Sequence, residues 1–174
     1  MANDAQKNDA TPNADVEKLG ELIKGIKFAM FTTVDSDGSL RSRPMATQEA
    51  EFDGTLWFFT DKTTPKVHEV EKEHHVNVSY ADPDDNRYVS VSGRAEMIDD
   101  KKKMEELWSP AIKAWFPDGL EDPRITLVKV DVEKAEYWDS PSSTLVQLAG
   151  FAKALITGKR MEDAGENEKI DLKH

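Results

Sequence analysis

Cysteine is absent from this 174-residue sequence. Its absence excludes disulfide bonds, thiolate metal ligands and a cysteine nucleophile, and it predicts a reducing, cytoplasmic setting. The N-terminal stretch carries no long apolar run, so the sequence predicts neither a signal peptide nor a membrane span. We expect residues 1–13 to be a disordered lead, because they are polar and lack periodicity.

Positive charge is also scarce. The 23 Lys and Arg residues face 34 Asp and Glu residues, which leaves a net charge of −11. Such a surface repels nucleic acid and anionic membranes, so we expect no partner of either kind. An anionic ligand would need a locally basic pocket. Candidates for it are Arg41, Arg43, Lys62 and Lys66.

Histidine shows no pattern typical of a metal centre or a catalytic triad. Three of the four histidines, His68, His74 and His75, fall within one short stretch. No His-Glu-x-x-His pattern occurs among them. The sequence therefore predicts no metal site, and it assigns no catalytic residue.

Runs of β-branched and aromatic residues, separated by turn residues, predict a mainly β protein. The expected strands cover 26–34, 39–47, 55–60, 75–80, 87–98 and, as one bent strand, 125–138. Expected helices begin at Asp15, at Pro65 after the N-cap Thr64, and near residue 100, and another covers 142–158. Six short strands with peripheral helices favour one antiparallel barrel domain over 14–158, followed by a charged tail at 159–174.

The stretch 42–69 joins two expected strands to the start of a short helix. Strand alternation puts Arg41 and Arg43 on one face. Hydroxyls and a lysine gather at the helix start, where unpaired backbone N–H groups and the helix dipole favour an anion. The pattern predicts a phosphate-binding corner. Its candidate ligands are Arg43, Thr60, Thr64 and Lys66, with Lys62 and Arg41 either further ligands or surface charges.

Five pieces of the chain carry a family resemblance: FTTVDSDGSLRSRPM, LWFFTDKTTPKVHEV, VSVSGRAEM, WFPDGLEDP and EYWD. Together they resemble the pyridoxamine-phosphate-oxidase-like split-barrel flavoproteins, and within them the bacterial general stress protein 26 branch. The likeness covers roughly residues 15–150. It implies a Greek-key split β-barrel that binds FMN, or FAD. It also implies a homodimer with two flavin sites at the subunit interface.

The resemblance gives several positions a role. It implies that Arg43 contacts the flavin phosphate from its strand and that Thr60 closes the next strand beside it. Thr64 and Lys66 match the ends of the family's Ser-Arg-Lys segment at the helix start. Guanidinium, ammonium and hydroxyl groups suit a phosphate independently of the resemblance, because charge-assisted hydrogen bonds are roughly twice as strong as neutral ones.

Two departures and one further match bear on function. Pro65 replaces the arginine of that segment, so Lys62 or Arg41 would have to supply the lost contact. Trp138 matches a tryptophan that the family places near the flavin across the dimer. No arginine follows Trp138 before Arg160, although the true oxidases grip their substrate there with an Arg-Leu-x-x-Arg segment.

The sequence thus predicts a flavin-binding general stress protein with a redox role and an unidentified substrate. Two alternatives stay open: a pyridoxamine or pyridoxine 5'-phosphate oxidase, and a non-enzymatic flavin-binding sensor or interaction module. A phosphate-binding corner alone does not distinguish FMN from FAD or a deazaflavin.

Overall fold

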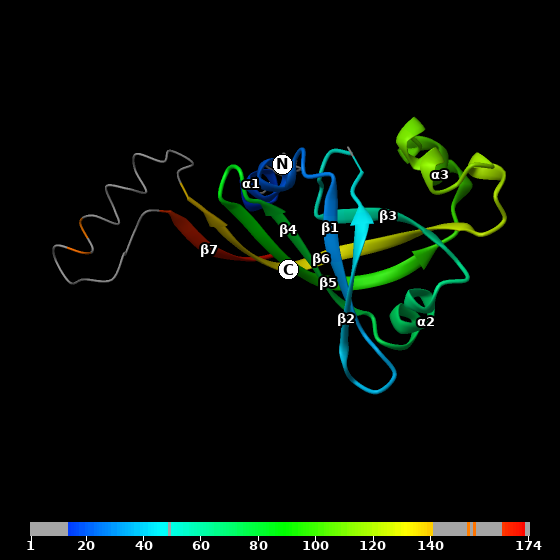
Figure 1. Ribbon diagram of the computed structural model, residues 1–174, viewed down its shortest axis with the longest axis horizontal. Coiled ribbons are helices and arrows are strands. Elements are labelled where there is room, and N and C mark those ends of the chain that lie inside the picture. The colour runs from blue at the N-terminus through cyan, green and yellow to red at the C-terminus, as the bar shows by residue number, and fades with distance from the viewer. Residues whose placement is uncertain (1–13, 49, 141–152, 154, 156–164, 173–174) are drawn as a thin grey trace, which may run out of the picture.

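Antiparallel strands make up most of the chain in the computed structural model, which describes residues 14–48, 50–140, 153, 155 and 165–172 (Figure 1). The strand order is β2-β1-β4-β5-β6-β3, and β7 also pairs with β6. The first and last strands of this path, β2 and β3, approach each other, which curls the sheet towards a barrel. The strands are β1 (Phe28–Val34), β2 (Leu40–Ala46), β3 (Thr55–Asp61), β4 (His75–Asp82), β5 (Arg87–Ile98), β6 (Ile125–Asp139) and β7 (Glu166–Asp171).

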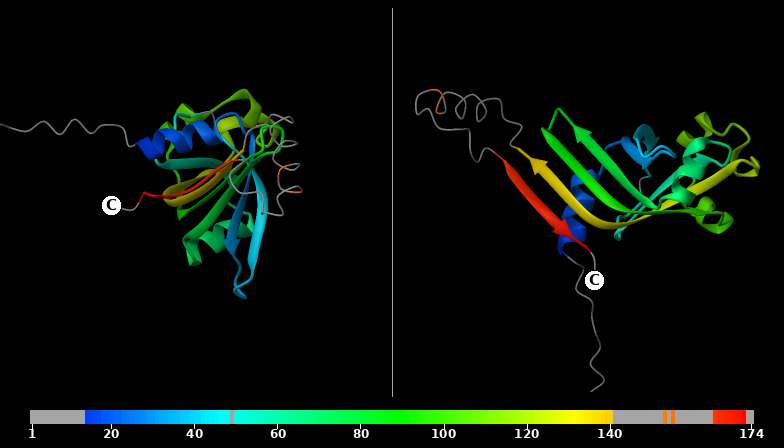
Figure 2. Two further views of the ribbon diagram at one scale, coloured as in Figure 1. Left: turned by 90° about the vertical axis from the view of Figure 1, so that its left-hand side faces the viewer. Right: turned by 90° about the horizontal axis from the view of Figure 1, so that it is seen from below.

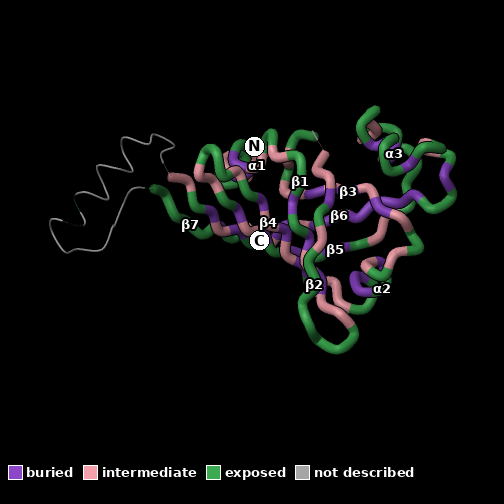
Figure 3. The backbone as a smooth tube through the Cα atoms, in the orientation of Figure 1, coloured by how far each residue is buried: buried purple, intermediate pink, exposed green. Residues whose placement is uncertain are grey.

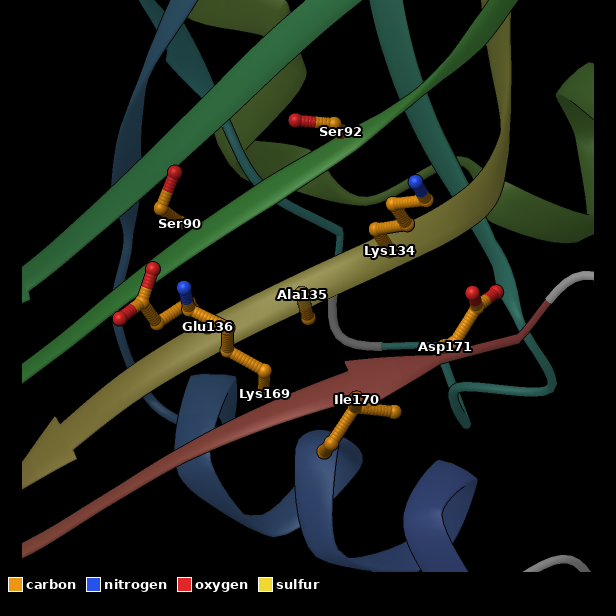
Figure 4. Close-up of a pocket in the computed structure, with 8 residues that line it drawn as sticks. All are labelled: Ser90, Ser92, Lys134, Ala135, Glu136, Lys169, Ile170 and Asp171. Atoms are coloured by element: carbon orange, nitrogen blue, oxygen red, sulfur yellow. The ribbon is translucent and has the colours of Figure 1, made fainter.

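Short helices pack around the sheet. They are α1 (Ala14–Ile23), α2 (Pro65–Lys72) and α3 (Lys101–Leu107), with the 3-10 helices η1 (Pro110–Ala114) and η2 (Gly119–Glu121). Helix α2 contacts β1 and β5, while α1 contacts β5 and lies beneath β6 and β7 (Figures 2 and 4). None of the described helices is long and apolar enough to cross a membrane.

The β1–β2 hairpin sets the orientation of the basic side chains. Its turn closes with a hydrogen bond from the Gly38 N–H to the Asp35 carbonyl, 2.9 Å, and Gly38 has a φ of +85° that few other residues tolerate. In the resulting register Phe31 lies opposite Arg43. The predicted alternation is confirmed, because Met45 is buried whereas Pro44 is exposed on this edge strand.

Alternate residues of the strands fill the main core. Phe31 and Phe58 meet edge to face at 5.8 Å between ring centroids, and Val78, Val91 and Val130 are at most 1% exposed around them. Figure 3 shows buried stretches alternating with more exposed ones along the strands. Truncating one of these phenylalanines to alanine would cost about 3–5 kcal/mol.

A second, smaller core lies under α3 and the two 3-10 helices. Leu127 of β6 is fully buried there, with Trp57 and Phe59 of β3 packed against the cluster. Trp108 meets the Phe59 ring edge-on at 5.8 Å. The aromatic-rich stretch after residue 107 therefore folds as a cap over β3 and β6.

The long strands β5 and β6 bend where their register shifts between Ser92 and Gly93 (Figure 2). A Cβ on Gly93 would lie 2.2 Å from the Asp131 carbonyl oxygen, so this close approach requires glycine. The register shift at Gly93 is typical of a β-bulge. It separates the half of β6 that pairs with β3 from the half that pairs with β7.

Strand β7 lies within the segment that the sequence predicts only as a charged tail. Ile170 is its one buried residue, and the Tyr137 hydroxyl donates to Glu168 across the β6–β7 pair, 3.1 Å. A strand with a single apolar residue offers no periodicity to detect. Among the described residues the sheet has seven strands rather than six, whereas the other strand boundaries match to within two residues. The predicted lead at 1–13 and most of the predicted helix at 142–158 lie outside the described residues.

Candidate functional site

Three elements bring the predicted phosphate ligands together: β2, the end of β3 and the first turn of α2. Thr64 is the N-cap of α2 and Pro65 its first residue, as predicted. The Thr64 hydroxyl, however, donates to the Asp61 carbonyl, 2.8 Å, and makes no cap bond to the helix. No side-chain cap therefore takes up the first backbone N–H groups of α2.

Lys66 is a half-buried cation in this corner. Its Nζ atom donates to the Thr60 Oγ1 atom at 2.7 Å and lies 3.5 Å from the Met45 sulfur. It makes no ion pair with any described residue. Burial lowers the pKa of Lys66, and the Arg43 guanidinium lowers it further. The protein thus holds a partly desolvated positive charge that an external anion would neutralise.

Hydrogen bonds hold the Arg43 guanidinium against Thr33 and Glu69. Its Nη2 atom donates to the Glu69 Oε2 atom at 2.7 Å, and its Nη1 atom donates to the Thr33 Oγ1 atom at 2.7 Å. The Thr33 hydroxyl in turn donates to the same Glu69 oxygen. Burial raises the pKa of Glu69, but the hydrogen bonds from Thr33 and Arg43 outweigh it and hold the pKa below its ordinary value.

Sequence reasoning missed Thr33 and Glu69 as members of this cluster. Glu69 stands three residues after Lys66 on α2, with the inward-facing Val67 and Val70 on either side. A charged residue among buried positions was the available signal. Thr33 gave no signal of its own, because only the strand register places it beside Arg43.

The two remaining cations lie differently. The Arg41 guanidinium is exposed at the edge of the cluster, 3.2 Å from an Asp35 oxygen and 3.6 Å from the Glu69 Oε1 atom. The Lys62 Nζ atom lies 2.6 Å from an Asp99 oxygen, away from the cluster, and both side chains are exposed. Of the two candidates to replace the arginine lost at Pro65, Arg41 is therefore the better placed.

The charges of this cluster do not cancel. Arg43 and Lys66 bring two positive charges and Glu69 one negative charge, while Arg41 is paired with Asp35. The net charge is +1 in a half-buried setting beside a helix N-terminus, which suits a phosphate group. No group of three His, Asp or Glu side chains suited to a metal ion occurs in the described part of the chain.

Trp138 lies far from Thr60 when the separation is measured along β6. Thr60 pairs with Thr126 near the start of β6, and Trp138 stands twelve residues further on near its other end. At about 3.3 Å per residue the two positions are up to about 40 Å apart along the strand. The two positions thus lie on different parts of β6, on either side of its register shift.

An exposed aromatic pair marks this distant end of the sheet. Trp138 is 41% exposed and lies directly opposite Tyr88 of β5, which is 42% exposed. Sequence reasoning missed Tyr88, because its neighbour is known only from the β5–β6 register. Two exposed aromatic rings side by side offer a surface for a further planar group.

A groove of about 360 Å³ lies over β5, β6 and β7 (Figure 4). Its residues Ser90 and Glu136 pair with each other two positions along the strands from Tyr88 and Trp138. Lys134 and Lys169 contribute positive charges, but each lies opposite an acid in the register, Asp171 and Glu136 respectively. The groove therefore has no excess positive charge for a second phosphate. Its polar lining is Ser90, Ser92, Lys134, Glu136, Lys169 and Asp171.

Comparison with known proteins shows the family of the chain and its fold. The family model described as "pyridoxamine 5'-phosphate oxidase like" matches residues 14–162. Protein bli-3 of Neurospora crassa is 32% identical over 154 residues, covering 83% of this chain and 74% of that protein.

Solved structures support the same assignment. A protein from Jannaschia sp. CCS1 described as a general stress protein 26 superposes with a TM-score of 0.73 at 25% identity, over 92% of this chain and all of that one. A Xanthomonas citri protein described as a general stress FMN/FAD binding protein has a TM-score of 0.64 at 27% identity, over 75% and 92% of the two chains. The predicted split-barrel fold is confirmed, and the chain belongs to the pyridoxamine 5'-phosphate oxidase-like family.

Proposed function

We propose that this chain binds FMN, with the flavin phosphate held between Arg43, Lys66 and the start of α2. The observation that carries the proposal is the half-buried Lys66 ammonium, which lies beside Arg43 and makes no ion pair with a described residue. A phosphomonoester carries about −1.5 to −2 charges at pH 7, which would offset this positive charge. The flavin binding ascribed to the Xanthomonas citri protein supports the proposal.

The residues of the corner take different parts. Arg43 and Lys66 would donate charge-assisted hydrogen bonds, and Thr60 orients Lys66 by accepting its hydrogen bond. Thr64 precedes the first turn of α2, where Pro65 has no N–H and the Val67 N–H donates to the Thr64 carbonyl, 3.1 Å, so the Lys66 N–H is the backbone donor of this turn that would meet an anion. Arg41 is a further ligand at the edge. FAD is the alternative occupant, but its phosphodiester groups each carry less charge than the FMN terminus. Bound flavin would supply the electron-transfer chemistry.

We propose further that the protein works as a homodimer. Trp138 and the phosphate corner lie at opposite ends of β6, so a second copy would have to bring its aromatic pair to the flavin of the first. Exposed apolar residues of the same sheet face, Phe28 and Met30, would be covered in such a dimer. Light scattering should give about twice the chain mass of 19.6 kDa. A monomer at micromolar concentration would contradict this arrangement.

For the reaction we propose a flavin-dependent redox role rather than pyridoxamine phosphate oxidation. The described groove carries balanced charges, and the sequence has no arginine between Trp138 and Arg160. We therefore expect negligible oxygen uptake with pyridoxamine or pyridoxine 5'-phosphate. Reduction of the bound flavin by NADH or NADPH would support the redox role. Tight flavin binding without any reduction by either donor would favour the sensor function.

The binding proposal is tested by titrating the purified protein with FMN, FAD and riboflavin and following flavin fluorescence. We expect FMN to bind, and Lys66→Ala to weaken it by about 10- to 100-fold, the equivalent of one lost charge-assisted bond. Lys62→Ala is the matched control, because Lys62 pairs with Asp99 outside the cluster. It should change the affinity less than about twofold. A wild-type protein that leaves FMN fluorescence unchanged would refute the proposal.

A further inference from the structure

Glu69 is an unexpected residue to find beside a phosphate site. Its side chain is 6% exposed, and its carboxylate adds a negative charge where an anion is proposed to bind. Its Oε1 atom is buried without a hydrogen bond, with Arg41 no closer than 3.6 Å. A buried acceptor left partly unsatisfied costs free energy, so some other interaction must hold Glu69 in this place.

That interaction is with Arg43. The Glu69 Oε2 atom accepts from the Arg43 Nη2 atom and from the Thr33 hydroxyl, and Thr33 accepts from the Arg43 Nη1 atom. The three side chains close a ring of hydrogen bonds, and Thr33 is fully buried. One N–H on each of two guanidinium nitrogens is thereby engaged. The remaining N–H donors of the Arg43 guanidinium can bind a ligand.

We propose that Glu69, with Thr33, is a positioning residue that fixes the Arg43 guanidinium for the phosphate and so sets the preference for phosphorylated over unphosphorylated flavin. The inference rests on the proposed FMN site. A free arginine side chain loses rotamer entropy when it is ordered, and here folding has already ordered it. The repulsion between Glu69 and a phosphate is the opposing cost.

A purely structural role for Glu69 predicts something different. If Glu69 only stabilised the barrel, its loss would weaken FMN and riboflavin binding alike, since both ligands share the isoalloxazine ring. If it positions Arg43, its loss changes only the binding of the phosphate. The ratio of the riboflavin Kd to the FMN Kd therefore separates the two roles.

The experiment measures both dissociation constants for wild type, Glu69→Ala and Glu69→Gln. We expect Glu69→Ala to lower the ratio by about tenfold while the riboflavin Kd stays within about twofold, because a charge-assisted anchor is lost. Glu69→Gln keeps an oxygen acceptor for Arg43 and should restore most of the ratio. Glu71→Ala is the matched control, because Glu71 is an exposed acid of the same helix.

A double variant tests whether Glu69 acts on phosphate binding through Arg43. In an Arg43→Met background, Glu69→Ala should not lower the ratio further, because the residue that it positions is gone. Should Glu69→Ala fail to fold, Thr33→Val tests the same ring and should lower the ratio as well. A ratio unchanged in Glu69→Ala, or one lowered equally with and without Arg43, would overturn the inference. If wild type binds no FMN, the proposed function itself fails.

Discussion

Arg43→Met should destabilise the protein strongly even in the absence of any ligand. The Arg43 Nη2 atom lies 2.7 Å from Glu69, whose side chain is only 6% exposed, and Arg43 is itself 19% exposed. Removing this cation leaves the buried carboxylate with the Thr33 hydroxyl and the exposed Arg41 at 3.6 Å as its remaining partners, and the loss of a buried ion-pair partner costs about 3–5 kcal/mol. At about 2–4 °C per kcal/mol for a chain of this size, the melting temperature should fall by about 6–20 °C.

A second substitution should recover much of this loss. Arg43→Met combined with Glu69→Leu replaces both charges by apolar groups of similar volume, a change that is often neutral for a buried pair. Urea unfolding of the ligand-free proteins at pH 7 measures the cycle. We expect a coupling free energy of about 2 kcal/mol or more. An Arg43→Met variant that loses less than about 1 kcal/mol, or a double variant no more stable than it, would refute the reasoning.

The same pair predicts a pH dependence with a definite sign. The pKa of Glu69 is lowered in the folded protein, so its contribution to stability is present above the unfolded value of about 4.3 and is lost as the pH falls through the folded value. Without Arg43, burial raises the pKa of Glu69 with less to oppose it. The difference in stability between wild type and Arg43→Met should therefore shrink as the solution is acidified below about pH 4.

Three further changes test other parts of the structure. Because burial lowers the pKa of Lys66, the preference for FMN over riboflavin should decline at a pH below lysine's ordinary value of about 10.4. The Lys66→Arg variant should keep its preference over the same pH range. A wild-type preference that stays constant to about pH 11 would argue against this. Gly93→Ala forces a Cβ against the Asp131 carbonyl and should lower the free energy of unfolding in urea by about 3 kcal/mol. Gly38→Ala places its Cβ in open space and should lower it by about 1 kcal/mol. Equal losses of unfolding free energy in the two variants would count against the clash. Burial, and then the bond to Glu168, raises the pKa of Tyr137 to about 12, so Tyr137→Phe should abolish an ultraviolet titration step near that pH; if the step remains, it belongs to another tyrosine.

Local rules of sequence account for much of what was predicted correctly. The turn ending at Gly38 and the start of α2 at Thr64 and Pro65 depend on residues adjacent in sequence. Strand alternation then places Arg43 on the inner face without knowledge of its neighbours. The meeting of Arg43, Thr60 and Lys66 was a hypothesis from their spacing and from the family resemblance, and the structure places all three in one cluster.

The remaining features depend on contacts between distant segments. Thr33 and Glu69 are separated by 36 residues, and nothing local indicates that they share a hydrogen bond. Tyr88 becomes a neighbour of Trp138 only through the register of β5 and β6. Lys62 shows the reverse error, since a cation close in sequence to the corner pairs with Asp99 elsewhere. Sequence spacing indicates which residues can meet, but the strand pairing decides which do.

The sharing of β6 between β3 and β7 has a consequence for how the chain is made. Both strands bind the same edge of β6, and β7 follows β6 in the chain, so it is synthesised after β6 and β3. Until residues 166–171 leave the ribosome, the backbone of residues 134–139 has an open edge that can pair with another chain. A nascent chain stalled before β7 would thus carry its aggregation hazard beside Trp138. Pairing of β7 with β6 covers this edge.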